Sequence, residues 1–384
     1  LGGVRARRRP RYYRQIVRLY LVRSVEYKRD ESEISKRLAF NGRGALSCDT
    51  FKTAIALSLD RIESVLKKFF SSSAPQVVAL DRRDADALEE LLYADTLGNL
   101  YAIEHYDIYG LPPASASGAR VTGNKLPAQY RGFVGIYEDG ILLSALLLGS
   151  NTVPIWLPDD DRMRSHAEVL AHLIYRSRGS IESLFGPSEC VLPIWEHLRK
   201  RLASPFSVRT VQPLLYLPPE KNLFSLYSAS LPELPGYLPS LQSVPESPGG
   251  YVRCTVLSDY DDVLPAAAAM FHEEVGIEPI ARYGSNYRNR VRSMVSEGKN
   301  VIVTNDLGVV VFKADLGISH LDAAQIQGVW VHPDYRGLGL AAPFLAAACE
   351  LFRERHPHLS LYVNNYNDRA LSLYQRTGWE DIGQ

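Results

Sequence analysis

The sequence predicts an α/β protein, with helices packed on mixed sheets, that is divided into two folded units. Its 384 residues are too many for one typical domain and suit two. From Val77 onward, short apolar runs typical of strands alternate with longer stretches whose apolar residues follow the period of a helix. A stretch rich in proline and serine interrupts this alternation. With 46% hydrophobic and 22% charged residues, the chain can bury its cores without disulfides or metals.

Residues 1–75 differ from the rest in charge. The first 37 residues contain 12 Lys+Arg and 4 Asp+Glu, whereas the complete chain is neutral, with 43 of each. An apolar stripe over Thr50–Phe70 predicts one helix. The chain opens with Leu1, and its first methionine is Met163. We therefore expect residues 1–75 to be a basic N-terminal extension that is either disordered or not part of the native protein.

An N-terminal α/β unit is expected over residues 76–216. Asp139-Gly140, between two apolar runs, is a typical hairpin signal. The other elements follow from apolar periodicity. The expected strands are Val77–Leu80, Gly132–Tyr137, Ile141–Leu148 and Val153–Leu157, and the expected helices are Asp84–Leu92, Ser165–Tyr175 and Pro193–Leu202.

Residues 217–250 are expected to form a linker. They contain seven prolines, six serines and three glycines, a composition that cannot sustain a long helix or a central strand. Apolar residues such as Leu223 and Tyr227 could still hold the linker against a folded surface.

The second unit, residues 251–384, shows a different order of elements. Two helices separate the first two strands, three strands then follow one another, and helices and strands alternate to the end. The expected strands are Val252–Leu257, Asn300–Val303, Val309–Asp315, Gln325–His332, Ser360–Val363 and one beginning at Trp379–Ile382, and the expected helices are Asp261–Glu274, Tyr287–Ser296, Leu340–Arg355 and Asp368–Thr377. This order predicts a mixed sheet.

The strongest chemical signal is a strand, a glycine turn and a helix in succession. The apolar strand ends at Pro333, and Gly337 and Gly339 precede the helix that begins near Leu340. Glycines let backbone N–H groups approach an anion closely, and the positive end of the helix dipole favours a phosphate or pyrophosphate. Arg336 adds positive charge at the entrance. Two glycines alone would equally fit a tight turn with a helix cap.

The turn resembles the signature Arg/Gln-x-x-Gly-x-Gly/Ala of the GNAT family of N-acetyltransferases. The matching residues are Arg336, Gly337, Leu338, Gly339, Leu340 and Ala341. The resemblance implies that this turn holds the pyrophosphate of acetyl-CoA, the co-substrate. It also implies that the backbone of Val329, Trp330 and Val331 pairs with the pantetheine arm like an added strand.

A second motif follows the strand at Ser360–Val363. Asn367, Ala370, Tyr374, Gly378 and Trp379 stand at the family's spacing. The resemblance implies that Asn367 and Ala370 contact the cofactor. It further implies that Tyr374 protonates the leaving thiolate of CoA, and that a backbone N–H at Val331 stabilises the charge on the thioester oxygen. A buried core tyrosine is the alternative for Tyr374.

An amine nucleophile must lose a proton before it attacks, which requires a base. The region between the first two helices of the second unit, which walls the acceptor site in this fold, clusters carboxylates around His272. We expect Glu274 to be the base, with Glu273 and Glu278 as the next candidates. The alternative is a solvated acidic helix end.

The resemblance extends over about residues 77–384, to an actinobacterial group of GNAT proteins with an uncharacterised N-terminal domain. That domain could itself be a degenerate GNAT-like half. Where its phosphate turn would follow, Pro158–Asp161 supplies three carboxylates that would repel a pyrophosphate, so we expect no acyl-CoA binding there. The family adds a strand after the one at Trp379, and the printed sequence ends at Gln384. We therefore expect the second sheet to lack its last strand.

These features predict an N-acyltransferase that transfers an acetyl group from acetyl-CoA to a primary amine on a small molecule or peptide. An acyl-CoA-binding regulatory module without turnover is the alternative. The chain outside the basic arm has no basic footprint, so any nucleic-acid binding would be confined to that arm. We do not expect such binding. No apolar run is long enough to span a membrane, and the four cysteines are scattered. We expect a cytoplasmic protein that binds no metal. A homodimer is one of the assemblies that the sequence allows.

Overall fold

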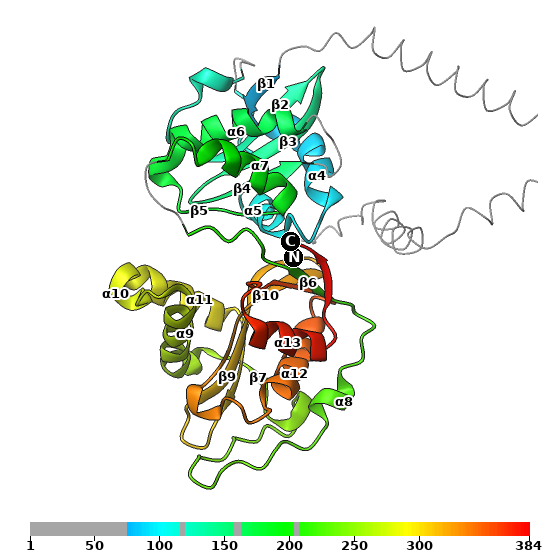
Figure 1. The fold of residues 1–384 in the computed structure, drawn as a ribbon, viewed down its shortest axis with the longest axis vertical. Coiled ribbons are helices and arrows are strands. Elements are labelled where there is room, and N and C mark those ends of the chain that lie inside the picture. The colour runs from blue at the N-terminus through cyan, green and yellow to red at the C-terminus, as the bar shows by residue number, and fades with distance from the viewer. Residues whose placement is uncertain (1–74, 116–119, 157–162, 203–206) are drawn as a thin grey trace, which may run out of the picture. The chain divides into compact units, whose positions relative to one another are not determined.

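Two β-sheets, each covered by helices, form the described part of the chain (Figure 1). The computed structural model describes residues 75–115, 120–156, 163–202 and 207–384. These residues fall within one compact unit, Ser72–Gln384. The expected helix at Thr50–Phe70, the basic arm and the acidic turn at Pro158–Asp161 lie outside the described residues. Among those described, no helix is long and apolar enough to cross a membrane.

The N-terminal sheet has five strands in the order of the chain. They are β1 (Gln76–Ala79), β2 (Gly132–Glu138), β3 (Ile141–Leu148), β4 (Asn151–Trp156) and β5 (Ser183–Leu184). The first four pair antiparallel, and β5 joins β4 in parallel. Asp139 and Gly140, between β2 and β3, have φ angles of 51° and 80°. Positive φ at both positions is what a type I′ turn requires, so the predicted hairpin is confirmed.

Helices cover both faces of this sheet. They are α4 (Ala85–Ala94), α5 (Leu100–Tyr109), α6 (Met163–Ser177) and α7 (Ser188–Leu198). Because side chains alternate along a strand, Val134 and Leu146 pack with α6 and α7, whereas Phe133 and Leu147 pack with α4 and α5. Helix α5 is absent from the sequence-based expectation, and Pro193, expected near the start of a helix, lies inside α7.

The C-terminal sheet has seven strands in the order β12-β6-β11-β10-β9-β8-β7. They are β6 (Leu214–Leu217), β7 (Arg253–Cys254), β8 (Asn300–Thr304), β9 (Val310–His320), β10 (Ala323–Val331), β11 (His358–Tyr362) and β12 (Glu380–Gly383). Only β10 and β11 run parallel, and every other neighbouring pair is antiparallel. This is the mixed sheet that the order of elements predicts.

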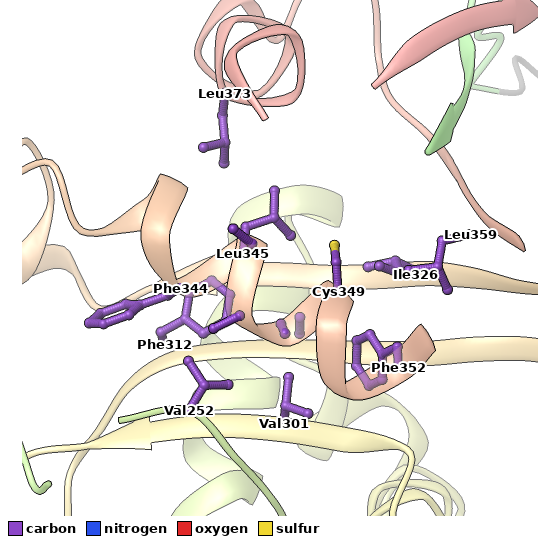
Figure 2. Close-up of a cluster of buried hydrophobic side chains, with 14 of the residues drawn as sticks. Val252, Val301, Phe312, Ile326, Phe344, Leu345, Cys349, Phe352, Leu359 and Leu373 are labelled. Atoms are coloured by element: carbon purple, nitrogen blue, oxygen red, sulfur yellow. The ribbon is translucent and has the colours of Figure 1, made fainter. Parts of the chain in front are cut away.

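Helices also cover both faces of the second sheet. They are α8 (Phe224–Tyr227), α9 (Tyr260–Val275), α10 (Pro279–Tyr283), α11 (Ser285–Ser296), α12 (Ala341–Arg353) and α13 (Asp368–Arg376). Helices α9 and α11 pack on one face around Ile302 and Trp330. On the other face, Phe344, Cys349 and Phe352 of α12 lie over the sheet (Figure 2). The alanines of α12, three of them fully buried in a row at 346–348, let its backbone come close to the strands.

Strand β6 occupies the place where the second sheet was expected to lack a strand. Residues 214–217 were assigned by sequence to the end of the N-terminal unit and the start of the linker, but they pair antiparallel with β11 on one side and β12 on the other. Leu217 is fully buried in the core of the second sheet. The expected boundary at residue 216 therefore falls inside a central strand, and the sheet has no unfilled position next to β11.

The expected linker packs on the second sheet along its length. Leu223 is buried in that core, and α8 forms one short helical turn. Further apolar residues of the segment lie half-buried against the same core, namely Leu226, Tyr227, Leu231, Leu234, Leu238 and Leu241. Its prolines prevent long regular elements, while its leucines hold it in place.

Candidate functional site

The parallel strands β10 and β11 separate part-way along their length. They pair only over residues 323–325 and 358–360. Beyond these residues β10 continues to Val331 beside β9, and β11 continues to Tyr362 beside β6. The facing edges therefore carry peptide groups that no neighbouring strand of the described sheet uses. An extended ligand can pair with such edges as an added strand.

Free backbone N–H groups follow the end of β10. A 3₁₀ turn at Pro333–Tyr335 leads into the glycine turn, and α12 then begins at Ala341. Gly337 and Gly339 have φ angles of 79° and 78°, a conformation that favours glycine. The N–H groups of residues 337–340 donate no hydrogen bond to any described residue. Free donors beside the N-terminus of a 13-residue helix suit an anion.

Arg336 connects the glycine turn to two other elements. Its Nε donates to the carbonyl oxygen of Val331 at 2.9 Å, and its Nη2 contacts both carboxylate oxygens of Glu273, at 2.7 and 2.9 Å. Trp330 Nε1 donates to the same carboxylate at 3.1 Å. The guanidinium thus fixes the turn to the end of β10 and to α9. Its charge, which the sequence suggested for the entrance, is balanced by Glu273.

The three candidate bases differ in their partners. Glu273 accepts the hydrogen bonds just described, and Glu278 lies 3.3 Å from Nδ1 of His272. Glu274 makes no hydrogen bond or ion pair with the described residues, and its side chain is exposed near the end of α9. Among the three carboxylates, that of Glu274 is the one left available to take a proton.

Tyr374 lies on α13 with its ring buried against Trp379, at a centroid distance of 5.9 Å. Burial raises the pKa of its phenol, and the nearby Cys349 and Glu274 raise it further. Glu274 thus acts electrostatically on the phenol, although the two residues lie far apart in the sequence. The phenol is protonated at neutral pH with or without this rise, as a proton donor must be.

Asn367 and Ala370 are joined by a hydrogen bond at the start of α13. Asn367 is the N-cap of α13, and its side-chain oxygen accepts a hydrogen bond from the backbone N–H of Ala370 at 3.2 Å. The side-chain N–H groups of Asn367 donate to no described residue, so they remain available to a ligand. The cap fixes the helix that carries Tyr374.

A fully buried lysine lies beside β10, and sequence reasoning assigns it no role. Nζ of Lys313 on β9 contacts Asp315 Oδ2 at 2.5 Å and the carbonyl oxygen of Gly328 at 3.0 Å. Gln327 pairs with Asp315 and Trp330 with Lys313, so β10 holds one extra residue between these pairs, a β-bulge. The lysine therefore ties the bulge to the neighbouring strand.

Glycine is required at the bulge. Gly328 has a φ of 59°, and a Cβ there would lie 2.4 Å from Asp315 Oδ2 and 3.0 Å from Lys313 Nζ. Asn300 completes the cluster, since its Nδ2 donates to Asp315 Oδ1 at 2.6 Å. Its buried Oδ1 has no partner among the described residues. Only the alternation of charge in Lys313-Ala314-Asp315, inside an apolar strand, could have drawn attention to this cluster in the sequence.

The N-terminal half contains a hydroxyl, imidazole and carboxylate in series. Ser144 Oγ lies 3.1 Å from His166 Nδ1, and His166 Nε2 lies 2.9 Å from Glu138 Oε1. Such a chain resembles that of a hydrolase, but Ser144 and His166 are both fully buried, and a nucleophile must reach its substrate. The chain therefore satisfies polar groups between the sheet and α6. Among the described residues, no group of three His, Cys, Asp or Glu side chains is placed to hold a metal.

Comparisons with known proteins agree with this geometry. Residues 292–379 match the model of the acetyltransferase (GNAT) family, and residues 132–223 match a domain of unknown function, DUF4081. No curated protein matches the chain. The first match runs from α11 to the start of β12 and includes the glycine turn, whereas the second ends beyond β6.

Solved structures resemble the chain over both sheets. A GCN5-related N-acetyltransferase from Sphaerobacter thermophilus is 14% identical, with a TM-score of 0.50 over 80% of this chain and 92% of that one. A tandem GNAT protein from the clavulanic acid biosynthesis pathway is also 14% identical, with a TM-score of 0.47 over 80% of this chain and 96% of that one. At such identity the Sphaerobacter protein shows the fold. Residues 292–379 thus match the GNAT acetyltransferase family, and both halves of the described chain have a GNAT-like fold.

Proposed function

We propose that the C-terminal half transfers an acetyl group from acetyl-CoA to a primary amine. The observation that supports this most directly is the row of free N–H groups at residues 337–340, beside the gap between β10 and β11. These donors would hold the pyrophosphate. The pantetheine arm would pair with the backbone of 329–331, so the thioester would lie between β10 and α13.

The proposed reaction is direct attack of the amine on the thioester carbon. Glu274 takes the proton of the amine as the C–N bond forms, since Glu273 and Glu278 are engaged by Arg336 and His272. A backbone N–H at Val331 stabilises the negative charge on the carbonyl oxygen. Tyr374 gives its proton to the sulfur as the C–S bond breaks, and the thiol leaves as CoA.

Calorimetric titration with acetyl-CoA tests the binding part of this proposal. We expect micromolar affinity in the wild-type protein and none in a variant with Gly337→Val and Gly339→Val, because valine cannot hold these φ angles or leave the N–H groups open. Gly140→Val is the matched control, since Gly140 has a φ of 80° in the hairpin of the other sheet. Failure of the folded wild-type protein to bind would refute the co-substrate assignment.

Release of the CoA thiol in the presence of amines tests turnover. Replacing Tyr374 by Phe keeps the packing against Trp379 and removes the proton, so kcat should fall by about 10²-fold or more while acetyl-CoA binding is retained. If the wild-type protein binds acetyl-CoA and releases no thiol with any amine, the regulatory alternative replaces the enzyme.

The N-terminal half has a separate part in this proposal. It does not bind acyl-CoA, and it shapes the acceptor site or the interface of a homodimer. An isotherm with one acetyl-CoA per chain would agree with this division, whereas two would contradict it.

A further inference from the structure

We infer that the acceptor amine carries an anionic group, a carboxylate or a phosphate, and that arginines on α10 and α11 bind that group. This inference rests on the proposed acetyl transfer and names the class of its acceptor. The segment 279–296, which holds both helices, contains four arginines and no Asp or Glu. The arginines are Arg282, Arg288, Arg290 and Arg292.

These arginines have no carboxylate partner among the described residues, in contrast to the arginines beside the β10 turn and on β7. All four are exposed, and none forms an ion pair with a described carboxylate. Arg292 lies over the ring of Tyr260, at 5.3 Å from its centroid. By contrast, Arg253 on β7 binds both oxygens of Asp259, and Arg336 binds both oxygens of Glu273. The segment therefore presents positive charge that the described protein does not neutralise.

The arrangement is unfavourable for the helix unless an anion binds. Arg288 and Arg292 are four residues apart on α11, where like charges repel. Arg288 also lies in the first turn of this 12-residue helix, at the positive end of its dipole. A carboxylate or phosphate near that end would relieve both effects. Arginine presents planar, bidentate donors that match either group.

The basic segment adjoins the part of α9 that carries the catalytic carboxylate. The ring of Phe271 packs edge-on against those of Tyr283 and Tyr287, with centroid distances of 6.2 and 5.7 Å. The next turn of α9 carries Glu273 and Glu274. Burial and the charge of Asp315 raise the pKa of Tyr287 to about 12, while Arg290 opposes this rise. The pKa of Tyr287 is thus affected both by Arg290 and by Asp315 of the cluster at the bulge of β10.

The test compares acceptors that differ only in their anionic group. The probes are phenylethylamine with phenylalanine, ethanolamine with phosphoethanolamine, and glucosamine with its 6-phosphate. We expect the anionic member of at least one pair to be acetylated with kcat/KM about tenfold or more above its neutral partner. The carboxylate and phosphate pairs distinguish the two sources of charge.

The variant Arg288→Gln/Arg290→Gln should lose this preference, with kcat/KM for the anionic amine falling about tenfold or more and that for the neutral amine unchanged. Lys200→Gln/Arg355→Gln removes the same charge at exposed positions without described ion pairs and should change neither value. Calorimetry of the same amines with CoA-loaded protein supplies a readout without turnover. Acetyl-CoA should bind both variants like the wild type.

Three results would overturn the inference. The first is that the wild-type protein uses and binds the neutral amines as well as, or better than, the anionic ones. The second is that the arginine variant loses kcat/KM equally for both members of a pair. The third is that this variant binds acetyl-CoA more weakly, which would assign the arginines to the cofactor. If the wild-type protein does not bind acetyl-CoA at all, the proposed function falls together with this inference. If it binds acetyl-CoA and prefers neutral amines, only the inference falls.

Discussion

Glu273 and Arg336 show how a residue's neighbours decide its role. From sequence, Glu273 is one of three candidate bases and Arg336 is a charge at the mouth of the phosphate turn. In the structure each satisfies the other, and Trp330 joins them. Both side chains remain partly exposed, so this ion pair adds little stability by itself. Its effect is to hold the end of β10, the glycine turn and α9 in one arrangement.

Lys313 and Asp315 form a different kind of pair, because the lysine is fully buried. Replacing Lys313 by Met leaves Asp315 uncompensated beside the bulge and should lower the free energy of unfolding by about 3–5 kcal/mol. Changing both residues, to Met and Asn, removes the charges together and keeps an acceptor for Asn300. We expect this double variant to be more stable than Lys313→Met in urea unfolding, and a double variant as unstable as the single one would contradict the pairing.

Strand β6 determines where the folded unit built on the C-terminal sheet begins. It contributes Leu215 and Leu217 to the core of the C-terminal sheet, and it separates β11 from β12. A fragment of residues 251–384 lacks this strand and should leave the edge of β11 unpaired, whereas one of residues 207–384 should keep the sheet complete. We expect the longer fragment to unfold cooperatively and the shorter one to aggregate or melt at a much lower temperature, as circular dichroism would show. Equal melting of the two fragments would contradict a structural need for β6.

The elements that the sequence predicted are those whose signal is local. The glycine turn, α12 and the hairpin at Asp139-Gly140 depend on neighbouring residues, and the structure has all three. The position of β6 depends on a partner strand far along the chain, which apolar periodicity does not report. Helix α5 was not predicted from the sequence because its apolar residues are spread around the helix and do not form one stripe. The cluster at Lys313 escaped because strand pairing, and not spacing, brings it to the bulge.

At the scale of the whole molecule, tyrosine side chains that are buried or half-buried predict that the protein is sensitive to alkali. Burial raises the pKa of Tyr93, Tyr137 and Tyr287 to about 12, and it raises that of Tyr362 and Tyr374 as well. An unfolded tyrosine titrates near pH 10. Above that pH the unfolded chain loses protons that the native protein keeps, so the stability that is present at neutral pH declines as pH rises toward 12.

We therefore expect the melting temperature to be level through neutral pH and to fall progressively above about pH 10. Absorbance of tyrosinate in the same samples should show a group of phenols that ionise only as the protein unfolds. If all the phenols titrated near pH 10 while the fold persisted, the burial of these rings would be contradicted. The basic N-terminal residues contribute no tyrosine to the five named here.

The place of β6 in the second sheet also constrains how the protein is made. Tyr216 on β6 and His358 on β11 meet across 142 residues of chain. During synthesis this apolar strand leaves the ribosome early and must wait, unpaired, until β11 and then β12 arrive on its two sides. Contacts this distant in sequence form slowly, and a waiting strand edge is open to wrong partners. Translation speed and chaperone access between these two points should thus govern the yield of folded protein more than the stability of the finished sheet does.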